Sequence, residues 1–181
     1  QSGIQTEHDG LEVDNCDISG FGLAGVNVLN GTGLSIHHNY IHHCQYQGLG
    51  YGVCIDTGTS AIEFNIFDWN RHSIAGTGRS GGGYVARHNV ELGVSLSHCF
   101  DMHGGRDRGD GTNVAGTSIE ISNNTFRAPV APIVIRGEPE DACQVHHNWF
   151  PMHAGPANAV SAEASTIVTD NAYGTEATVI E

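Results

Sequence analysis

The chain has 181 residues, of which 25 are glycine and 39% are hydrophobic, and this size fits one domain or part of a larger one. Its 20 acidic residues outnumber seven arginines, lysine is absent, and the formal net charge is -13. This charge argues against binding nucleic acid, which needs cationic side chains to neutralise phosphates, and against anionic membrane surfaces. No apolar run approaches the roughly 20 residues of a membrane-spanning helix, so we expect no membrane insertion.

An acidic, lysine-free composition resembles that of proteins from high-salt organisms, in which counter-ions screen the self-repulsion of the surface. We therefore hypothesise a halophilic protein. Five cysteines, an odd number without C-x-x-C spacing, indicate neither a zinc knuckle nor a full disulfide framework. We interpret them as small buried apolar residues.

A repeat organises the whole chain. An aliphatic residue, two variable residues, an asparagine, one variable residue and an Ile, Phe or Tyr recur five times, with asparagines at 39, 65, 124, 148 and 171. Imperfect copies centred on Cys16 and Asn89 complete the series, and the steps are 23, 26, 24, 35, 24 and 23 residues. The long fourth step coincides with the glycine- and charge-rich segment 104–116, so we predict a loop insertion there.

Each repeat contains three short predicted strands. Before the asparagine, apolar and polar residues alternate, as Leu11 and Val13 do with Glu12 and Asp14, which is typical of a strand with one buried face. A short strand follows the asparagine, and a third strand follows the glycine-rich turns. The predicted third strands are Val53–Asp56, His72–Ala75, Phe100–His103, Ile133–Arg136 and Ala159–Glu163. Three strands per repeat predict rungs of a parallel β-solenoid stacked roughly 4.8 Å apart.

The repeated asparagine suits a stacked turn, because its amide can bond to the rungs above and below. This all-β pattern resembles the right-handed parallel β-helix of the pectate-lyase-like superfamily, whose rungs carry an Asn ladder between the second and third sheets. The resemblance implies about seven rungs over essentially all 181 residues. It does not imply one function, because the superfamily includes lyases, hydrolases, epimerases, adhesins and phage fibres.

We predict a single domain over residues 1–181. Gly3–Thr6 resembles the third strand of an earlier rung, and Thr178–Glu181 resembles the same strand of a later one. Because solenoid ends need polar caps, we expect a segment of a longer protein or ends that stack on other chains.

The resemblance places a substrate cleft on the outer face of the sheet formed by the third strands. Its predicted outward residues form one column along successive rungs, with Arg71 or His72 filling the gap that the small Ala75 leaves. The column reads Asp56, Ala75, His103, Arg136 and Glu163. Loop residues 45–51 and 106–113 would wall this surface, and insertions on one side of a repeat array usually mark the binding face.

This set of residues favours β-elimination in a uronic-acid-containing polysaccharide. Arg136 is predicted to neutralise the carboxylate, His103 to act as the base, and Tyr51 or His72 to act as the acid. Arg71, Asp101 and Glu163 are predicted to bind substrate. Calcium held by Asp56 and Asp101 would replace or assist the arginine, because oxygen ligands suit that ion.

Two alternatives remain open. An inverting glycoside hydrolase needs two carboxyl groups about 6.5 to 9.5 Å apart, and Asp56 and Asp101 are predicted roughly 10 Å apart at the backbone. A non-catalytic carbohydrate-binding protein, adhesin or surface filament would use the column as a polar ladder. All three interpretations expect an extracellular or cell-surface protein that binds polysaccharide.

The paired histidines at 37–38, 42–43 and 146–147 are interpreted as turn residues, with a transition-metal site, for instance His37 with Glu63, as the alternative.

Overall fold

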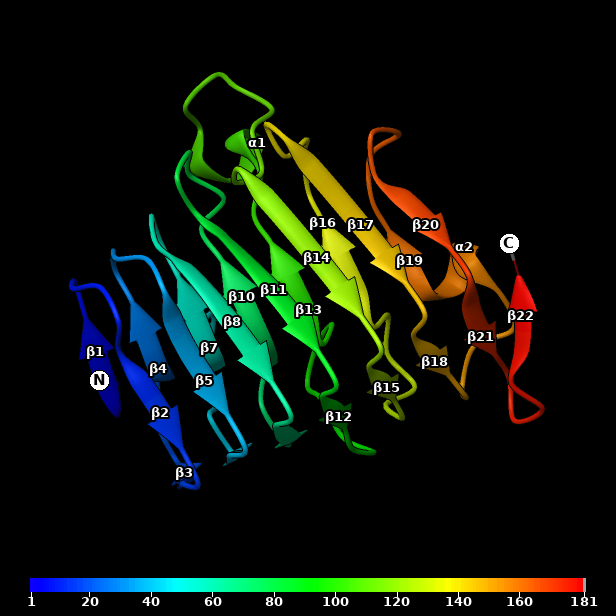
Figure 1. Cartoon of the computed structure of the whole chain (residues 1–181), viewed down its shortest axis with the longest axis horizontal. Coiled ribbons are helices and arrows are strands. Elements are labelled where there is room, and N and C mark those ends of the chain that lie inside the picture. Colours follow the sequence, from blue (N-terminus) through cyan, green and yellow to red (C-terminus); the bar gives the residue numbers. More distant parts are fainter. Residues whose placement is uncertain (181) are drawn as a thin grey trace.

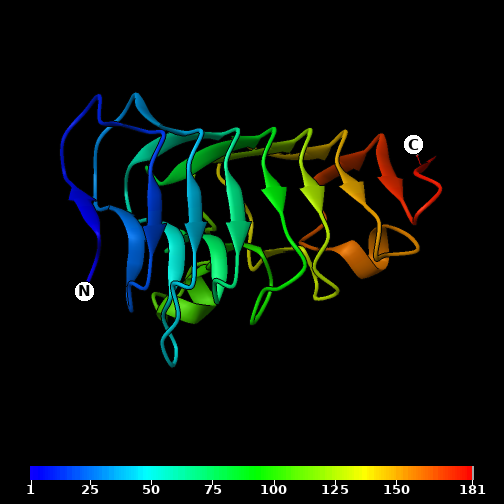
Figure 2. The ribbon, with the colours of Figure 1, turned by 90° about the horizontal axis from the view of Figure 1, so that it is seen from below.

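The computed structural model describes residues 1–180 as a stack of about seven turns, each with three short strands (Figure 1). Sheets A and B each have seven strands, and sheet C has eight. All pairs between successive rungs are parallel, and the two termini lie at opposite ends of the stack (Figure 2). The predicted parallel β-helix, with three strands per rung, is confirmed.

The three sheets take their strands in rotation along the chain. Sheet A contains β1 (Ile4–Thr6), β4 (Ala24–Val28), β7 (Tyr51–Ile55), β10 (His72–Gly76), β13 (Phe100–Met102), β16 (Ile133–Ile135) and β19 (Val160–Ser161). Sheet B contains β2 (Glu12–Asp14), β5 (Leu34–His37), β8 (Thr59–Glu63), β11 (Gly83–Arg87), β14 (Ser118–Ser122), β17 (Ala142–His146) and β20 (Ile167–Thr169). Sheet C contains β3 (Asp17–Ser19), β6 (Tyr40–His42), β9 (Ile66–Asp68), β12 (Val90–Glu91), β15 (Thr125–Phe126), β18 (Trp149–Phe150), β21 (Asn171–Tyr173) and β22 (Thr178–Ile180).

The asparagine ladder lies at the turn between sheets B and C. Asn124 shows its pattern: its backbone N–H and its side-chain amide both donate to Asn148 Oδ1 at 2.9 Å, and the amide also donates to the Ala86 carbonyl at 2.9 Å. The same bonds link Asn39, Asn65, Asn89, Asn124, Asn148 and Asn171 in series. Each buried amide is therefore satisfied by its neighbours, as the sequence predicts.

The residue before each ladder position has a left-handed backbone, with φ between 50° and 57°. Asn15, His38, Phe64, His88, Asn123, His147 and Asp170 occupy these positions. For residues other than glycine this conformation costs about 1–2 kcal/mol, and the ladder bonds next to it offset that cost. His37 and Glu63 are register partners on β5 and β8, but His37 contacts Glu12 at 3.0 Å and Glu63 pairs with Arg87, so a transition-metal site there stays a prediction.

Apolar side chains from all three sheets fill the interior. Four phenylalanines contact one another along it, and Phe100 of sheet A meets Phe67 and Phe126 of sheet C edge-to-face at ring distances of 6.1 and 4.8 Å. The inward column of sheet C reads Ile18, Ile41, Phe67, Glu91, Phe126, Phe150 and Tyr173. Glu91 is the exception, a buried carboxyl group in an apolar column.

The segment 104–116 leaves the stack as a projecting loop that carries the short helix α1 (Gly105–Arg108) (Figure 1). This is the segment that the sequence predicts as an insertion. A second short helix, α2 (Pro156–Ala159), precedes β19. The expectation for the C-terminal strand was wrong: β22 folds back antiparallel on β21 instead of joining sheet A. The chain reverses between β21 and β22 in a turn that begins at Gly174, whose backbone is left-handed (φ 69°). Glu181 lies outside the described residues.

All five cysteines are free, and Cys44, Cys99 and Cys143 are buried, as the apolar interpretation predicts, whereas Cys16 is exposed. None of the helices within residues 1–180 has the length and apolar character needed to cross a membrane.

Candidate functional site

The outward residues of sheet A form a column in which one member is charged. Cys54, Ala75, Asp101 and Val134 occupy equivalent positions on β7, β10, β13 and β16. The predicted column placed Ala75 level with Asp56 and His103, and this register was wrong. In the structure Ala75 is the register partner of Asp101. The residue level with Asp56 is Thr77, which directly follows β10 as Asp56 directly follows β7. The site is therefore centred on Asp101.

Asp101 points outward, yet other side chains cover it completely, and its residue exposure is 0%. Arg136 forms a two-pronged contact, with Nη2 donating to Oδ2 at 2.6 Å and Nε donating to Oδ1 at 3.2 Å. His103 Nε2 lies 3.2 Å from Oδ2, and His98 Nε2 lies 3.1 Å from Oδ1. Burial alone would raise the pKa of Asp101, but the contacts from His103, His98 and Arg136 outweigh it and hold the pKa far below its usual range.

The α1 loop secures one side of this cluster. Asp107 accepts a bond from Arg136 Nη1 at 3.1 Å and lies 3.8 Å from His103 Nδ1. Arg108 anchors the loop by donating to the carbonyl oxygens of Thr77 at 2.9 Å and Val114 at 3.0 Å. The guanidinium of Arg136 is thus held between two carboxylates, which neutralise it and fix its position.

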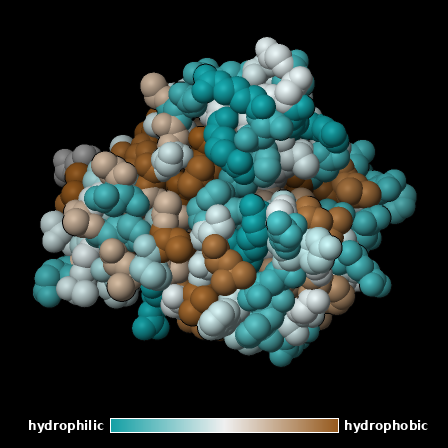
Figure 3. Space-filling view, turned by 180° about the vertical axis from the view of Figure 1, so that it is seen from behind, coloured by the Kyte–Doolittle hydropathy of each residue, from teal (hydrophilic) through white to brown (hydrophobic). Residues whose placement is uncertain are grey.

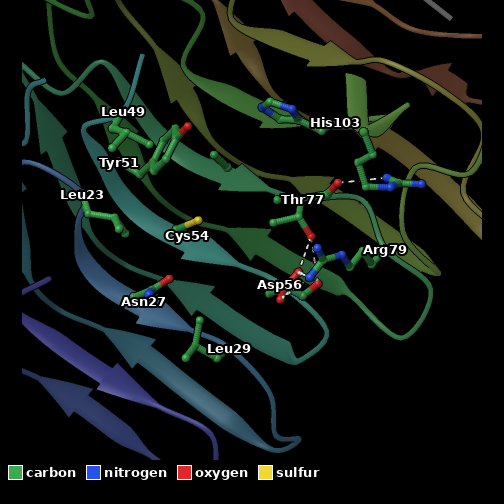
Figure 4. A pocket seen from close by; sticks show the side chains of 13 residues that line it. Leu23, Asn27, Leu29, Leu49, Tyr51, Cys54, Asp56, Thr77, Arg79 and His103 are labelled. Carbon is green, nitrogen blue, oxygen red and sulfur yellow. Dashed lines mark hydrogen bonds and ion pairs between the residues drawn. The ribbon is translucent and has the colours of Figure 1, made fainter. Parts of the chain in front are cut away.

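A groove of about 380 Å³ runs beside this cluster over β4, β7 and β10. Its lining combines Leu23, Leu29 and Leu49 with the polar residues Asn27, Tyr51, Asp56, Thr77, Arg79, Arg108 and His103 (Figure 4). Asp56 accepts hydrogen bonds from Thr77 Oγ1 at 2.6 Å and from Arg79 Nη1 at 2.8 Å.

Seen from behind the view of Figure 1, the surface mixes hydrophilic and apolar residues instead of presenting one apolar face (Figure 3).

Tyr51 and His72 stack on each other at the start of their strands, with ring centroids 5.7 Å apart. His72 is buried, and its Nδ1 donates to the His98 carbonyl oxygen at 2.7 Å. Burial lowers the pKa of His72 to about 4 despite that hydrogen bond. Burial raises the pKa of Tyr51, while the nearby Arg71 guanidinium partly opposes that rise. Tyr51 therefore keeps its phenolic proton at neutral pH.

The structure brings most of the predicted site residues together and separates one. Tyr51, His72, Asp101, His103 and Arg136 meet around the end of the groove, and Arg71 lies beside Tyr51. Glu163 lies on the far side of Arg136, where it lines a second cavity of about 330 Å³ with Arg106, Asp107 and Ser161.

The two carboxylates predicted to hold calcium each face an arginine guanidinium, Arg79 at Asp56 and Arg136 at Asp101. Calcium takes six to eight oxygen ligands, and these two groups do not gather such a set. The calcium site stays a prediction.

Sequence reasoning missed three residues of this site, His98, Asp107 and Thr77. His98 lies three residues before Asp101, outside any strand, and Asp107 lies in the inserted loop. The repeat therefore could not assign either residue to a position in a rung. A signal existed for Thr77, because it follows Gly76 where Asp56 follows Ile55 in the parallel pairing.

Comparison of the chain with protein-family models, curated proteins and solved structures finds no match.

Proposed function

We propose that the groove on the outer face of sheet A binds a uronic-acid-containing polysaccharide and that the protein cleaves it by β-elimination. The observation that carries the proposal is the convergence of Tyr51 and His103 on one groove, with Arg71 beside Tyr51 and the buried Asp101 carboxylate behind His103. A groove of this volume falls within the range of small-ligand sites and suits a few sugar units of a longer chain.

Arg71 is the cation we assign to the substrate carboxylate. Arg136 was predicted for this role, but its guanidinium is held by Asp101 and Asp107. Among residues 1–180, no carboxylate lies within ion-pair distance of Arg71, in contrast to Arg79, Arg87, Arg108 and Arg136. A free guanidinium can grip a carboxylate with two donors and thereby acidify the neighbouring C–H bond.

His103 is the proposed base. Its Nε2 faces Asp101, while its Nδ1 lies 3.8 Å from Asp107, too far for a hydrogen bond. Asp101 therefore orients the imidazole so that Nδ1 accepts the proton next to the uronate carboxylate. The electron pair of that C–H bond forms the new carbon–carbon double bond as the glycosidic C–O bond breaks.

Tyr51 is the proposed acid, because it lines the groove and its hydroxyl, which makes only a long hydrogen bond of 3.3 Å to the Gly48 carbonyl oxygen, carries a proton for the leaving oxygen. His72 was the other candidate, but its residue exposure is 1% and its Nδ1–H is bound to the His98 carbonyl. Arg136 and Asp107 act as positioning residues that hold Asp101 and His103 in place.

The buried carboxylate argues against the hydrolase alternative. A glycosidase needs one carboxyl group that stays protonated to act as an acid. The contacts that lower the pKa of Asp101 keep it ionised, so Asp101 cannot supply that proton.

Product analysis on a panel of uronic-acid polymers tests the proposal. We expect an unsaturated product with ultraviolet absorbance, and we expect Tyr51→Phe and His103→Gln to lower its rate of formation by at least about a hundredfold. Matched controls are Tyr40→Phe, at a tyrosine of β6 in sheet C, and His147→Gln, at a ladder turn. New reducing ends without unsaturation would indicate hydrolysis. Binding without either product would indicate a carbohydrate-binding protein, and both outcomes contradict the proposal.

A further inference from the structure

A group of potential metal ligands lies next to the groove. One donor atom each from His72, His98 and Asp101 lies within 4.8 Å of the other two. These residues come from the start of β10, from the loop before β13 and from β13 itself, so the parallel register of sheet A brings them together. The proposed elimination gives no chemical role to His72 or His98.

We propose that His72, His98 and Asp101 bind one divalent metal ion of the zinc class. Two imidazole nitrogens and one carboxylate oxygen are ligands that suit Zn²⁺, Co²⁺ or Ni²⁺, whereas calcium prefers an all-oxygen set. Three protein ligands with a fourth position open to water is the arrangement that zinc takes when it is not purely structural.

The separations are close to those that such an ion requires. With bonds of about 2.0–2.2 Å in a tetrahedral arrangement, neighbouring donor atoms lie about 3.3–3.5 Å apart. His98 Nε2 and Asp101 Oδ1 are already 3.1 Å apart, and the widest pair is no more than 4.8 Å apart.

Hydrogen bonds around the cluster orient its ligands. Because a carbonyl oxygen only accepts, His72 Nδ1 must carry the proton it shares with His98, which leaves His72 Nε2 with a free lone pair. Metal-bound histidines are commonly fixed in this way. Arg136 holds Asp101 through Oδ2 at 2.6 Å and contacts Oδ1 more loosely, at 3.2 Å. Oδ1 is also the oxygen that faces His98 Nε2, at 3.1 Å.

His98 Nε2 gives an independent indication. This atom is buried and, among the residues that the structure describes, it has no aligned hydrogen-bond partner, although it lies 3.1 Å from Asp101. Leaving a buried polar atom without a partner costs about 1–3 kcal/mol, and a metal ion would satisfy it. The rest of the His98 side chain is 20% exposed, so ions from solvent can reach the cluster.

The test uses cobalt as the probe. After treatment with a chelator, the protein is titrated with Co²⁺, followed by its visible absorption bands, and then with Zn²⁺ in competition. We expect one tight equivalent, which His98→Gln and His72→Gln each weaken at least tenfold. His42→Gln is the matched control: it removes a half-buried histidine that contacts Asp17 at 2.8 Å beside His43, a pair able to bind metal adventitiously.

Absence of a tight equivalent in the parent protein overturns the proposal without any variant. So does an equivalent that survives His98→Gln but disappears in His42→Gln. Thermal unfolding of each variant identifies loss of fold, and His98→Gln keeps the test decisive if the buried His72→Gln fails to fold. Because no sugar is present, the result is independent of the proposed lyase activity.

Discussion

Glu91 makes the stability of this β-helix depend on pH in an unusual direction. Its carboxyl group is completely buried between rungs that place Phe67 and Phe126 in the same column, and neither oxygen forms a hydrogen bond of acceptable geometry. Burial raises its pKa from 4.5 to about 8; Ser73 opposes this slightly, and Asp68 adds to it. The group is therefore protonated in the folded protein at neutral pH.

Proton linkage gives the direction and the size of the change in unfolding free energy with pH. Because the folded pKa lies above the unfolded value, the folded protein binds more protons between pH 4.5 and pH 8. The unfolding free energy therefore has its full value below pH 4.5, and it falls as pH rises through that window. At 1.36 kcal/mol per pKa unit, the loss is about 3 kcal/mol at pH 7 and about 5 kcal/mol at pH 9.

Glu91→Gln removes the titration while keeping shape and polarity. We expect it to match the parent protein at pH 4.5 in urea unfolding and to exceed it by about 5 kcal/mol at pH 9. Glu91→Met should stabilise at every pH, because it also removes two unpartnered oxygens from an apolar column. Glu138→Gln, at an exposed position, controls for loss of a carboxyl group. A difference between parent and Glu91→Gln that does not change with pH would refute the reasoning.

Three further predictions concern the ladder, the loop and the surface charge. Asn124→Ala removes an amide that accepts from Asn89 and donates to Asn148 and Ala86. We therefore expect the unfolding free energy measured in urea to fall by about 3–5 kcal/mol, whereas Asn158→Ala, at an exposed position, should change it by close to zero. Arg108→Ala removes the bond that ties the α1 loop to Thr77 and a bond to Val114 within the loop. Limited proteolysis should then cut within residues 104–116 at least tenfold faster, whereas the exposed Arg106→Ala should leave the rate unchanged. If the net charge of -13 reflects adaptation to salt, the melting temperature should rise steeply between dilute buffer and molar salt, and a salt-independent melting temperature would remove the halophile hypothesis.

The repeat made the fold predictable because it encodes contacts directly. Asparagines about two dozen residues apart can satisfy one another only if the rungs stack in register, and the observed bonds between Asn39 and Asn65 and along the rest of the ladder do so. The strand pairs then follow from that register. A second asparagine turn, where Asn70 accepts from the Cys44 N–H at 3.0 Å, spans only two rungs and was too short to appear as a repeat.

The candidate site was harder to predict because its residues lie where the repeat fails. His98 and Asp107 belong to segments of irregular length, and no spacing rule assigns them to a rung. The predicted role of Arg136 depended on its charge being free, but ion pairing is a property of the folded loop, which brings Asp107 within 3.1 Å. Residue type suggested the proposed chemistry, but only the folded structure shows that the charge of Arg136 is already paired.

Departures from the repeat coincide on one rung, which contains β11, β12 and β13. This rung has Glu91 in the position that an aromatic or aliphatic residue fills elsewhere, the buried Asp101 on its outer face and the α1 loop after it. Phe100 crosses the interior here and continues the aromatic stack past Glu91. Buried carboxyl groups oppose stability, and natural proteins accept such local conflicts chiefly at functional sites. The neighbouring rungs, with regular ladders and apolar cores, supply the stability that lets this rung hold two buried acids, and this is the physical reason for placing the site there.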